Sequence, residues 1–100
     1  MTIEKTELDG QITLKLDGWL DTVSAPELGE MIDGIEAASA IILDFENVEY
    51  IASSGLRQVV AAGKRARELD AEFSVRSVGT EVMSIFRLTG LDKKLAVTEK

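Results

Sequence analysis

The stretch IILDFENVEYIASSGL, residues 41–56, contains an apolar strand, a short acidic loop and the start of a helix. Its first three residues carry no polar side chain, which predicts a strand over Ala40–Phe45 that is covered on both faces. The acidic loop is expected over Glu46–Glu49, after which Tyr50 and Ile51 return toward the core. We expect the rest of the chain to support this strand and the helix that follows it.

Two serines and a glycine, Ser53-Ser54-Gly55, precede apolar residues at helical spacing, which predicts a helix over Gly55–Leu69. Serine is a preferred N-cap, because its oxygen accepts hydrogen bonds from the free amides of the first turn. Those amides and the helix dipole also favour anions. From the residues alone, Ser53 is therefore either an N-cap or a hydroxyl to which phosphate is added and removed.

Length and charge limit the classes of partner. A chain of 100 residues is one domain, residues 1–100, and 45% hydrophobic residues suffice for a modest core. The net charge of −7 disfavours nucleic acid and anionic membrane as partners, because both require clustered Lys and Arg. It favours a basic protein surface instead.

Two residue types are missing altogether. Without cysteine there is no disulfide, thiol nucleophile or thiolate metal site, and without histidine there is no Ser-His-Asp triad and no usual zinc site. The sequence also has no phosphate-binding glycine loop. We therefore expect no enzyme activity, no metal and no cofactor. The absence of a leader-like or membrane-spanning segment predicts a cytoplasmic protein.

Hydrophobic periodicity and turn signals place the other elements. Ser24 and Glu27 have the spacing of a capping box, and Thr80 is the expected cap of the last long helix. Gly90 is expected to end that helix in a left-handed conformation. The remaining expected elements are strands at Thr2–Leu8, Gln11–Asp17, Glu72–Ser77 and Leu95–Thr98, a hairpin turn at Asp9-Gly10, a turn over Gly18–Asp21, and a first helix that ends near Ala38.

The expected order is β-β-α-β-α-β-α-(β). After the hairpin, strands alternate with helices, which is typical of the α/β class. We therefore predict one mixed, mostly parallel sheet with the helices packed mainly on one face.

Three motifs of this sequence resemble motifs of the STAS domain, as found in anti-sigma factor antagonists. The main one is Ala52-Ser53-Ser54-Gly55-Leu56-Arg57, which is similar to the family's Asp-Ser-Ser/Thr-Gly-Leu-Gly at a helix start. Gly18-Trp19-Leu20-Asp21 resembles the family's Gly-x-Leu-Asp. The segment from Ile85 to Leu91 resembles its late Phe-x-x-x-Gly-Leu element. Together the matches extend over essentially the whole chain.

The resemblance implies a phosphorylation-switched binding module. In the family, an anti-sigma factor that is also a serine kinase of the GHKL type phosphorylates the serine that aligns with Ser53, and a cognate phosphatase reverses this. The unphosphorylated form binds the anti-sigma factor and frees a sigma factor. Ser54 is a secondary acceptor, and we expect a monomer or weak dimer. The implied partner surface contains Asp21, Glu49, Ala52, Ser53, Ser54, Gly55, Leu56 and Arg57.

Several of these positions have an alternative interpretation. Ala52 stands where the family usually has Asp, which favours a phosphorylation-independent STAS scaffold or a transporter-associated regulatory subunit. Arg57, four residues after Ser53, either reaches a phosphate there or is an ordinary solvated Arg. Asp21 is either a turn residue or a partner contact. Trp19 is expected to be partly buried against the hairpin, with a partner contact as the alternative.

Overall fold

The computed structural model describes all residues, 1–100, and shows five strands and four helices along one chain. In chain order the elements are β1 (Thr2–Leu8), β2 (Gln11–Leu20), α1 (Ala25–Asp33), β3 (Ala40–Ile51), α2 (Ser53–Glu68), β4 (Glu72–Val78), α3 (Thr80–Thr89), α4 (Leu91–Lys94) and β5 (Ala96–Glu99).

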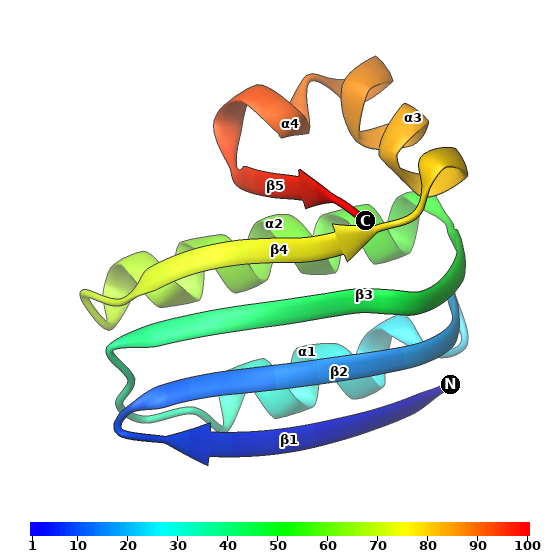
Figure 1. Ribbon diagram of the computed structural model, residues 1–100. Helices are drawn as coiled ribbons and strands as arrows, with labels where there is room; N and C mark the ends of the chain where they lie inside the picture. The colour runs from blue at the N-terminus through cyan, green and yellow to red at the C-terminus, as the bar shows by residue number, and fades with distance from the viewer.

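The strands form one sheet in the order β1-β2-β3-β4-β5, which Figure 1 shows from the bottom to the top of the view. β1 and β2 form an antiparallel hairpin, closed by Asp9 and Gly10, which both have positive φ angles. Every later pair is parallel, with α1, α2 and the α3–α4 pair as the crossovers. The predicted mixed, mostly parallel sheet is confirmed.

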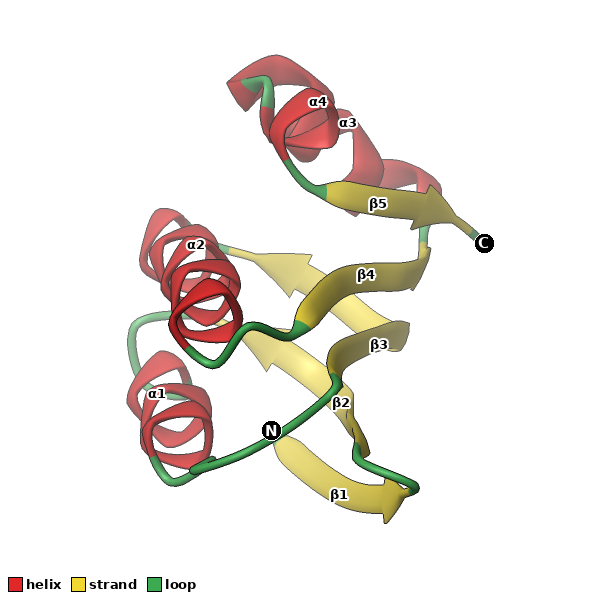
Figure 2. Cartoon of the chain, turned by 90° about the vertical axis from the view of Figure 1, so that its left-hand side faces the viewer, coloured by secondary structure: helices red, strands yellow, loops and turns green.

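Helices α1 and α2 cover one face of the sheet, and the opposite face carries no helix (Figure 2). The core lies under the two helices, where Leu14, Leu43 and Val75 occupy one row across three strands and are fully buried. Leu28 of α1 and Val59 of α2 belong to the same core on the helix side and are also fully buried. This one-sided packing confirms the predicted placement of the helices.

The open face corrects the expectation that the strand around residue 42 is covered on both sides. Ile41 and Leu43 point toward the helices and are buried, whereas Ile42 points the other way and is only half-buried. Its neighbours in register are Thr13 and Ser74, which are polar. An unbroken apolar run therefore did not require two covering layers here.

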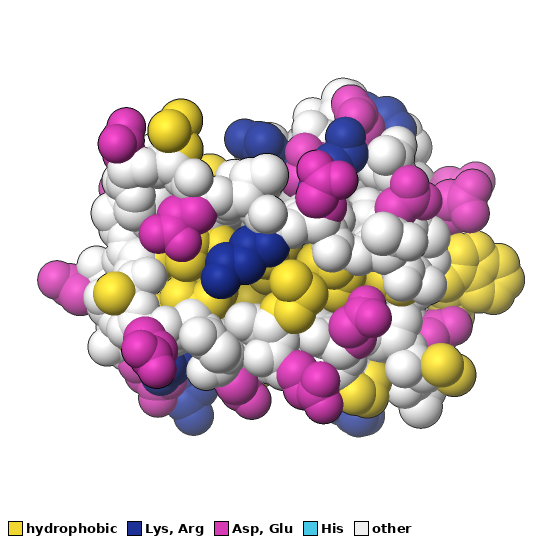
Figure 3. All heavy atoms as spheres, turned by 90° about the horizontal axis from the view of Figure 1, so that it is seen from below, with side chains coloured by type: hydrophobic (Ala, Val, Ile, Leu, Met, Phe, Trp, Pro, Cys, Tyr) yellow, Lys and Arg dark blue, Asp and Glu magenta, His cyan; other side chains and the backbone are white.

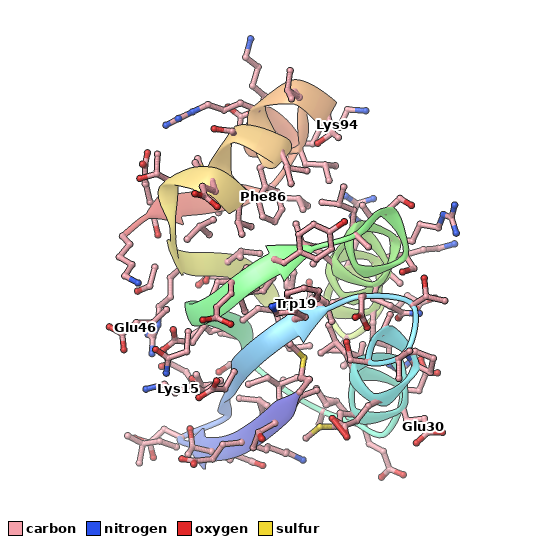
Figure 4. The ribbon with its side chains drawn as sticks, turned by 90° about the vertical axis from the view of Figure 1, so that its right-hand side faces the viewer. Lys15, Trp19, Glu30, Glu46, Phe86 and Lys94 are labelled. Atoms are coloured by element: carbon pink, nitrogen blue, oxygen red, sulfur yellow. The ribbon has the colours of Figure 1, made fainter.

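Charged side chains of alternating sign cross this open face. Glu4, Lys15, Asp44 and Arg76 are register partners on β1 to β4. Arg76 forms an ion pair with Asp44 at 3.6 Å, and Lys15 forms one with Glu46 at 3.6 Å, a pair that Figure 4 labels. Opposite charges on neighbouring strands favour this register over a shifted one.

Both central strands are longer than the sequence predicts. The expected turn at Gly18–Asp21 and the expected loop at Glu46–Glu49 are wrong, because β2 continues to Leu20 and β3 to Ile51. The two segments stay paired through two register shifts, and Gly18 takes a φ of +113° between them. Local turn signals were overridden because each segment supplies the other's hydrogen bonds.

Helix ends also differ from the predictions. α1 ends at Asp33 rather than near residue 38, and Arg65 Nη2 of α2 donates to the free carbonyl of Ile35 at 2.7 Å. Ser24 is the residue before α1 but makes no side-chain cap, so the capping box does not form. α3 is preceded by Gly79 rather than capped by Thr80.

The two edges of the sheet differ. At one edge β1 has no strand beyond it, and a band of hydrophobic side chains is visible on the surface seen from that side (Figure 3). At the other edge lie β5, α3 and α4 (Figure 1), where Phe86 of α3 packs on Phe45 with ring centroids 6.0 Å apart. Gly90 separates α3 from α4 with a φ of +75°, as predicted.

Candidate functional site

The candidate site lies where β2 and β3 end, and Figure 4 looks onto this end of the molecule. Helix α2 begins at Ser53 with Ala52 as the N-cap residue, so the interpretation of Ser53 as an N-cap is wrong. Alanine has no side-chain acceptor, and no side chain caps this helix start. The amides of the first turn therefore remain free, and the exposed Ser53 stands among them.

The start of α2 lies directly against the end of β2. The amide of Ala52 donates to the carbonyl of Leu20 at 2.9 Å. A Cβ on Gly55 would lie 2.6 Å from that same carbonyl oxygen and 2.9 Å from Ile51 Cγ1. Gly55 is therefore required for the close approach of helix and strand. It is buried, so its contribution to the site is to hold the serines in place.

The loop between β2 and α1 is held by Asp21. Its Oδ1 accepts hydrogen bonds from the amides of Val23 at 3.0 Å and Ser24 at 3.1 Å. The Ser24 hydroxyl donates to the carbonyl of Trp19 at 2.6 Å. The hydrogen bond from the Ser24 amide is the largest effect on the pKa of Asp21 and lowers it from its ordinary 3.8. Desolvation opposes it, whereas the Ser24 hydroxyl, 3.2 Å from Oδ1, and the Val23 amide lower the pKa further.

One side-chain contact joins the two loops of the site. Thr22 Oγ1, after β2, lies 3.2 Å from Ser54 Oγ, at the start of α2. Ser54 is half-buried and already engaged, whereas Ser53 is exposed and has no side-chain hydrogen bond. Of the two serines, Ser53 is therefore the more accessible to another protein.

The sequence did not predict the exposed aromatic pair at the ends of β2 and β3. Trp19 and Tyr50 are register partners with ring centroids 5.3 Å apart, and their side chains are 57% and 45% exposed. The expectation that Tyr50 returns toward the core was wrong, and Trp19 packs on Tyr50 rather than against the hairpin. Alternation along the strand was the available signal: each directly precedes a buried residue, Leu20 or Ile51.

The other residues at this end of the sheet differ in how far they are exposed. Val23, which was not predicted, is 89% exposed in the β2–α1 loop. Glu49 is exposed at the end of β3, and Arg57 is exposed on α2, where it forms no ion pair with any residue of the chain. Leu56 is half-buried against the core. The structure thus places hydroxyls, two aromatic rings and a valine at the same end of the sheet.

No three side chains among the Asp and Glu residues converge in a way that could hold a metal ion. No helix of the structure is long and apolar enough to cross a membrane.

The chain is similar to one protein family and to individual proteins of known sequence or structure. The sequence model of the STAS domain family matches residues 2–100. The anti-sigma-B factor antagonist of Staphylococcus aureus is 31% identical over 101 residues, which cover 99% of this chain and 94% of that protein. The crystal structure of an anti-sigma factor antagonist from Mycobacterium paratuberculosis is 27% identical, with a TM-score of 0.88 over 99% of this chain and 86% of that one.

One further solved structure is similar to this chain in fold. The Bacillus cell fate determinant SpoIIAA, solved in its phosphorylated form, is 17% identical to this chain. The TM-score is 0.77 over 96% of this chain and 90% of that one. The same arrangement of strands and helices is therefore present in a protein that carries a phosphate.

Proposed function

This chain belongs to the STAS domain family, and we propose that it is an anti-sigma factor antagonist whose binding is switched by phosphorylation of Ser53. The observation that carries the proposal is the accessible Ser53 hydroxyl in the uncapped first turn of α2. The similarity to the Staphylococcus aureus antagonist along nearly the full length of both proteins supports the same conclusion.

The proposed contact surface consists of the ends of β2 and β3, the β2–α1 loop and the first turn of α2. Trp19, Tyr50 and Val23 supply exposed apolar area at the same end of the sheet as Ser53. Aromatic residues are enriched at protein interfaces because they bury a large area and lose little side-chain entropy. Glu49 adds negative charge at the edge of this surface, in keeping with a partner that presents basic groups.

A phosphate on Ser53 would change this surface without unfolding the domain. It adds about −1.5 to −2 charges at neutral pH. The free amides and dipole of α2 stabilise such a charge, so the helix start tolerates it. A partner seated on the neighbouring aromatic pair would meet a bulky, strongly hydrated dianion. Phosphorylation therefore weakens binding while the fold persists.

The proposed partners follow from this role. An anti-sigma factor that is also a serine kinase of the GHKL type binds the unphosphorylated chain and modifies Ser53. A cognate phosphatase restores the binding form. In this proposal the chain acts in the cytoplasm as a monomer or weak dimer, performs no catalysis itself and uses no cofactor. Arg57, exposed and free of ion pairs one turn along α2, contacts the phosphate or the partner.

One observation favours a second function. Ala52 supplies neither a cap nor a charge beside Ser53, whereas the family usually has Asp there. If the kinase requires that carboxylate, Ser53 stays unmodified and the chain is a constitutive scaffold or a transporter-associated subunit. The two functions differ in whether charge at position 53 controls binding.

The deciding experiment compares four baits in pull-downs from a lysate of the source organism: wild type, Ser53→Ala, Ser53→Asp and Ser84→Asp. Ser84 is an exposed serine on α3, outside the proposed surface, so its aspartate variant controls for added charge. We expect the wild type, Ser53→Ala and Ser84→Asp to capture an anti-sigma factor kinase and Ser53→Asp to lose it. Equal capture by all four baits would support the scaffold function.

A direct test of modification complements the pull-down. The captured kinase and ATP should add one phosphoryl group to the wild type and to Ser84→Asp, and none to Ser53→Ala, as read by intact mass. If Ser53→Ala is modified at the wild-type rate, Ser53 is not the acceptor. Far-UV circular dichroism of the modified chain should match that of the unmodified chain.

A further inference from the structure

A groove of about 630 Å³ lies between the second half of α2 and the segment that joins α4 to β5. Figure 2 shows α2 and α4 flanking this part of β4. The groove is on the same helix as Ser53 but near its other end. Its volume falls within the range of small-molecule sites in proteins, about 300–1,000 Å³.

The floor of the groove is apolar and depends on a glycine. Gly63 lies in the middle of α2, where glycine is a poor helix former. A Cβ at this position would lie 3.2 Å from Phe73 Cδ2 and 3.3 Å from Leu95 Cδ2. Both of these side chains are half-buried and line the groove. Any larger residue at position 63 would therefore intrude on the floor.

Unpaired cations border the same floor. Lys64 and Arg67 come from one face of α2, and Lys94 comes from α4, where Figure 4 labels it. None of the three takes part in the four ion pairs of the chain. Asp70 and Glu72 also line the groove but form no ion pair with these cations. In a chain of net charge −7, this groove therefore has three cations against two carboxylates along its lining.

We propose that this groove binds a small amphiphilic anion, a carboxylate or phosphate carried on an aliphatic or aromatic body. The body lies on Gly63, Phe73 and Leu95 and removes their apolar surface from water. The anionic head contacts the cations, and the planar guanidinium of Arg67 can hold two oxygens at once. Neither half of the ligand is sufficient alone, because the apolar floor consists of only a few half-buried residues and the cations are exposed to solvent.

The binding test uses the full chain with uniform ¹⁵N labelling, titrated with laurate and with dodecyl phosphate below their micellar concentrations. Dodecanol provides the same apolar body without charge, and acetate provides the charge without the body. We expect saturable binding of both long-chain anions at one site, with amide shifts concentrated in residues 60–73 and 91–96. Dodecanol and acetate should bind at least about tenfold more weakly. The relative affinity of the two anions identifies the preferred head group.

Variants separate this groove from the rest of the surface. Arg67→Glu should weaken laurate binding about tenfold, because it replaces an attraction by a repulsion. Lys5→Glu makes the same charge change at an exposed, unpaired lysine on β1 and should change the affinity by less than about twofold. Gly63→Ala should also weaken binding, and it keeps the helix because alanine is the better helix former. Ser53→Asp should leave the affinity unchanged, so this result is independent of the proposed switch.

Several results would overturn the proposal. They are equal affinity for laurate and dodecanol, amide shifts centred elsewhere, equal losses in Arg67→Glu and Lys5→Glu, or no saturable binding of either anion. Binding only of an acidic peptide, with none of the small anions, would also overturn it, since the groove would then belong to a protein interface.

Discussion

The substitution Gly55→Ala tests the packing that positions the candidate site. The added methyl group would lie 2.6 Å from the carbonyl oxygen of Leu20, 2.8 Å from Leu20 Cγ and 2.9 Å from Ile51 Cγ1. All three distances are shorter than normal contacts. The oxygen cannot turn aside, because it accepts the amide of Ala52 and belongs to β2. The helix start must therefore move away from the sheet.

Two opposing terms set the magnitude. Overpacking a tight core costs about 1–3 kcal/mol, and a clash with backbone belongs near the top of this range. Alanine regains at most about 1 kcal/mol over glycine through helix propensity. The net loss in the free energy of unfolding is about 2 kcal/mol. For a domain of this size, that loss lowers Tm by about 8–16 °C.

Thermal and urea unfolding, followed by circular dichroism, would measure this loss. Gly29→Ala is the matched control within α1, because the methyl group there meets only the flexible end of Gln58, at 2.8 Å from Oε1. That side chain can rotate away, so Gly29→Ala should keep or raise the stability by up to about 1 kcal/mol. A Gly55→Ala protein as stable as the wild type would refute the close-packing argument.

Three more predictions concern the core, the pH dependence and the open face. Leu43→Ala should cost about 2–5 kcal/mol of unfolding free energy, because Leu43 is fully buried. Ile42→Ala should cost clearly less, because Ile42 lies on the open face and is only half-buried. Equal losses in urea unfolding would contradict the one-sided core. An NMR titration of the Asp21 carboxyl should give a pKa below its ordinary 3.8. The ionised carboxylate therefore stabilises the folded domain fully above pH 3.8, and this stabilisation is lost as the pH falls through the lower folded pKa. Asp21→Asn should remove this part of the pH dependence of the unfolding free energy. Lys15→Glu should destabilise the domain by at most about 1 kcal/mol, because it places a second negative charge next to Glu46 on an exposed surface. The loss should shrink in high salt, which screens the repulsion. A loss that salt does not change would argue against a charge effect.

The elements that the sequence predicted well are those with strong local patterns. Asp9-Gly10 between two alternating segments defined the hairpin, and Gly90 after an apolar period defined the end of α3. The alternation of strands and helices after that hairpin was sufficient for the mixed sheet and its one-sided helices. These signals succeed because they act within a few residues of one another and do not depend on distant partners.

The strand ends show where local signals fail. Gly18 and the acids around Glu49 are residues typical of turns, yet β2 and β3 pair along both segments. Pairing between segments about thirty residues apart satisfies the backbone hydrogen bonds of each, and this outweighs the local preference. The longer strands carry Trp19 and Tyr50 outward, and the exposed aromatic pair was missed because Trp19 was assigned to a turn and Tyr50 to the segment after a loop.

The sequence by itself determined the family resemblance, the order of the elements and the position of Ser53 at the beginning of a helix. Only the tertiary structure decided that Ala52 rather than a serine is the N-cap, that Ser54 is engaged by Thr22, and that Ser53 is exposed with no side-chain hydrogen bond. The physical reason is the same in each case. The exposure and bonding of a side chain depend on which distant backbone lies next to it, and here the end of β2 lies against the start of α2 because Gly55 has no side chain.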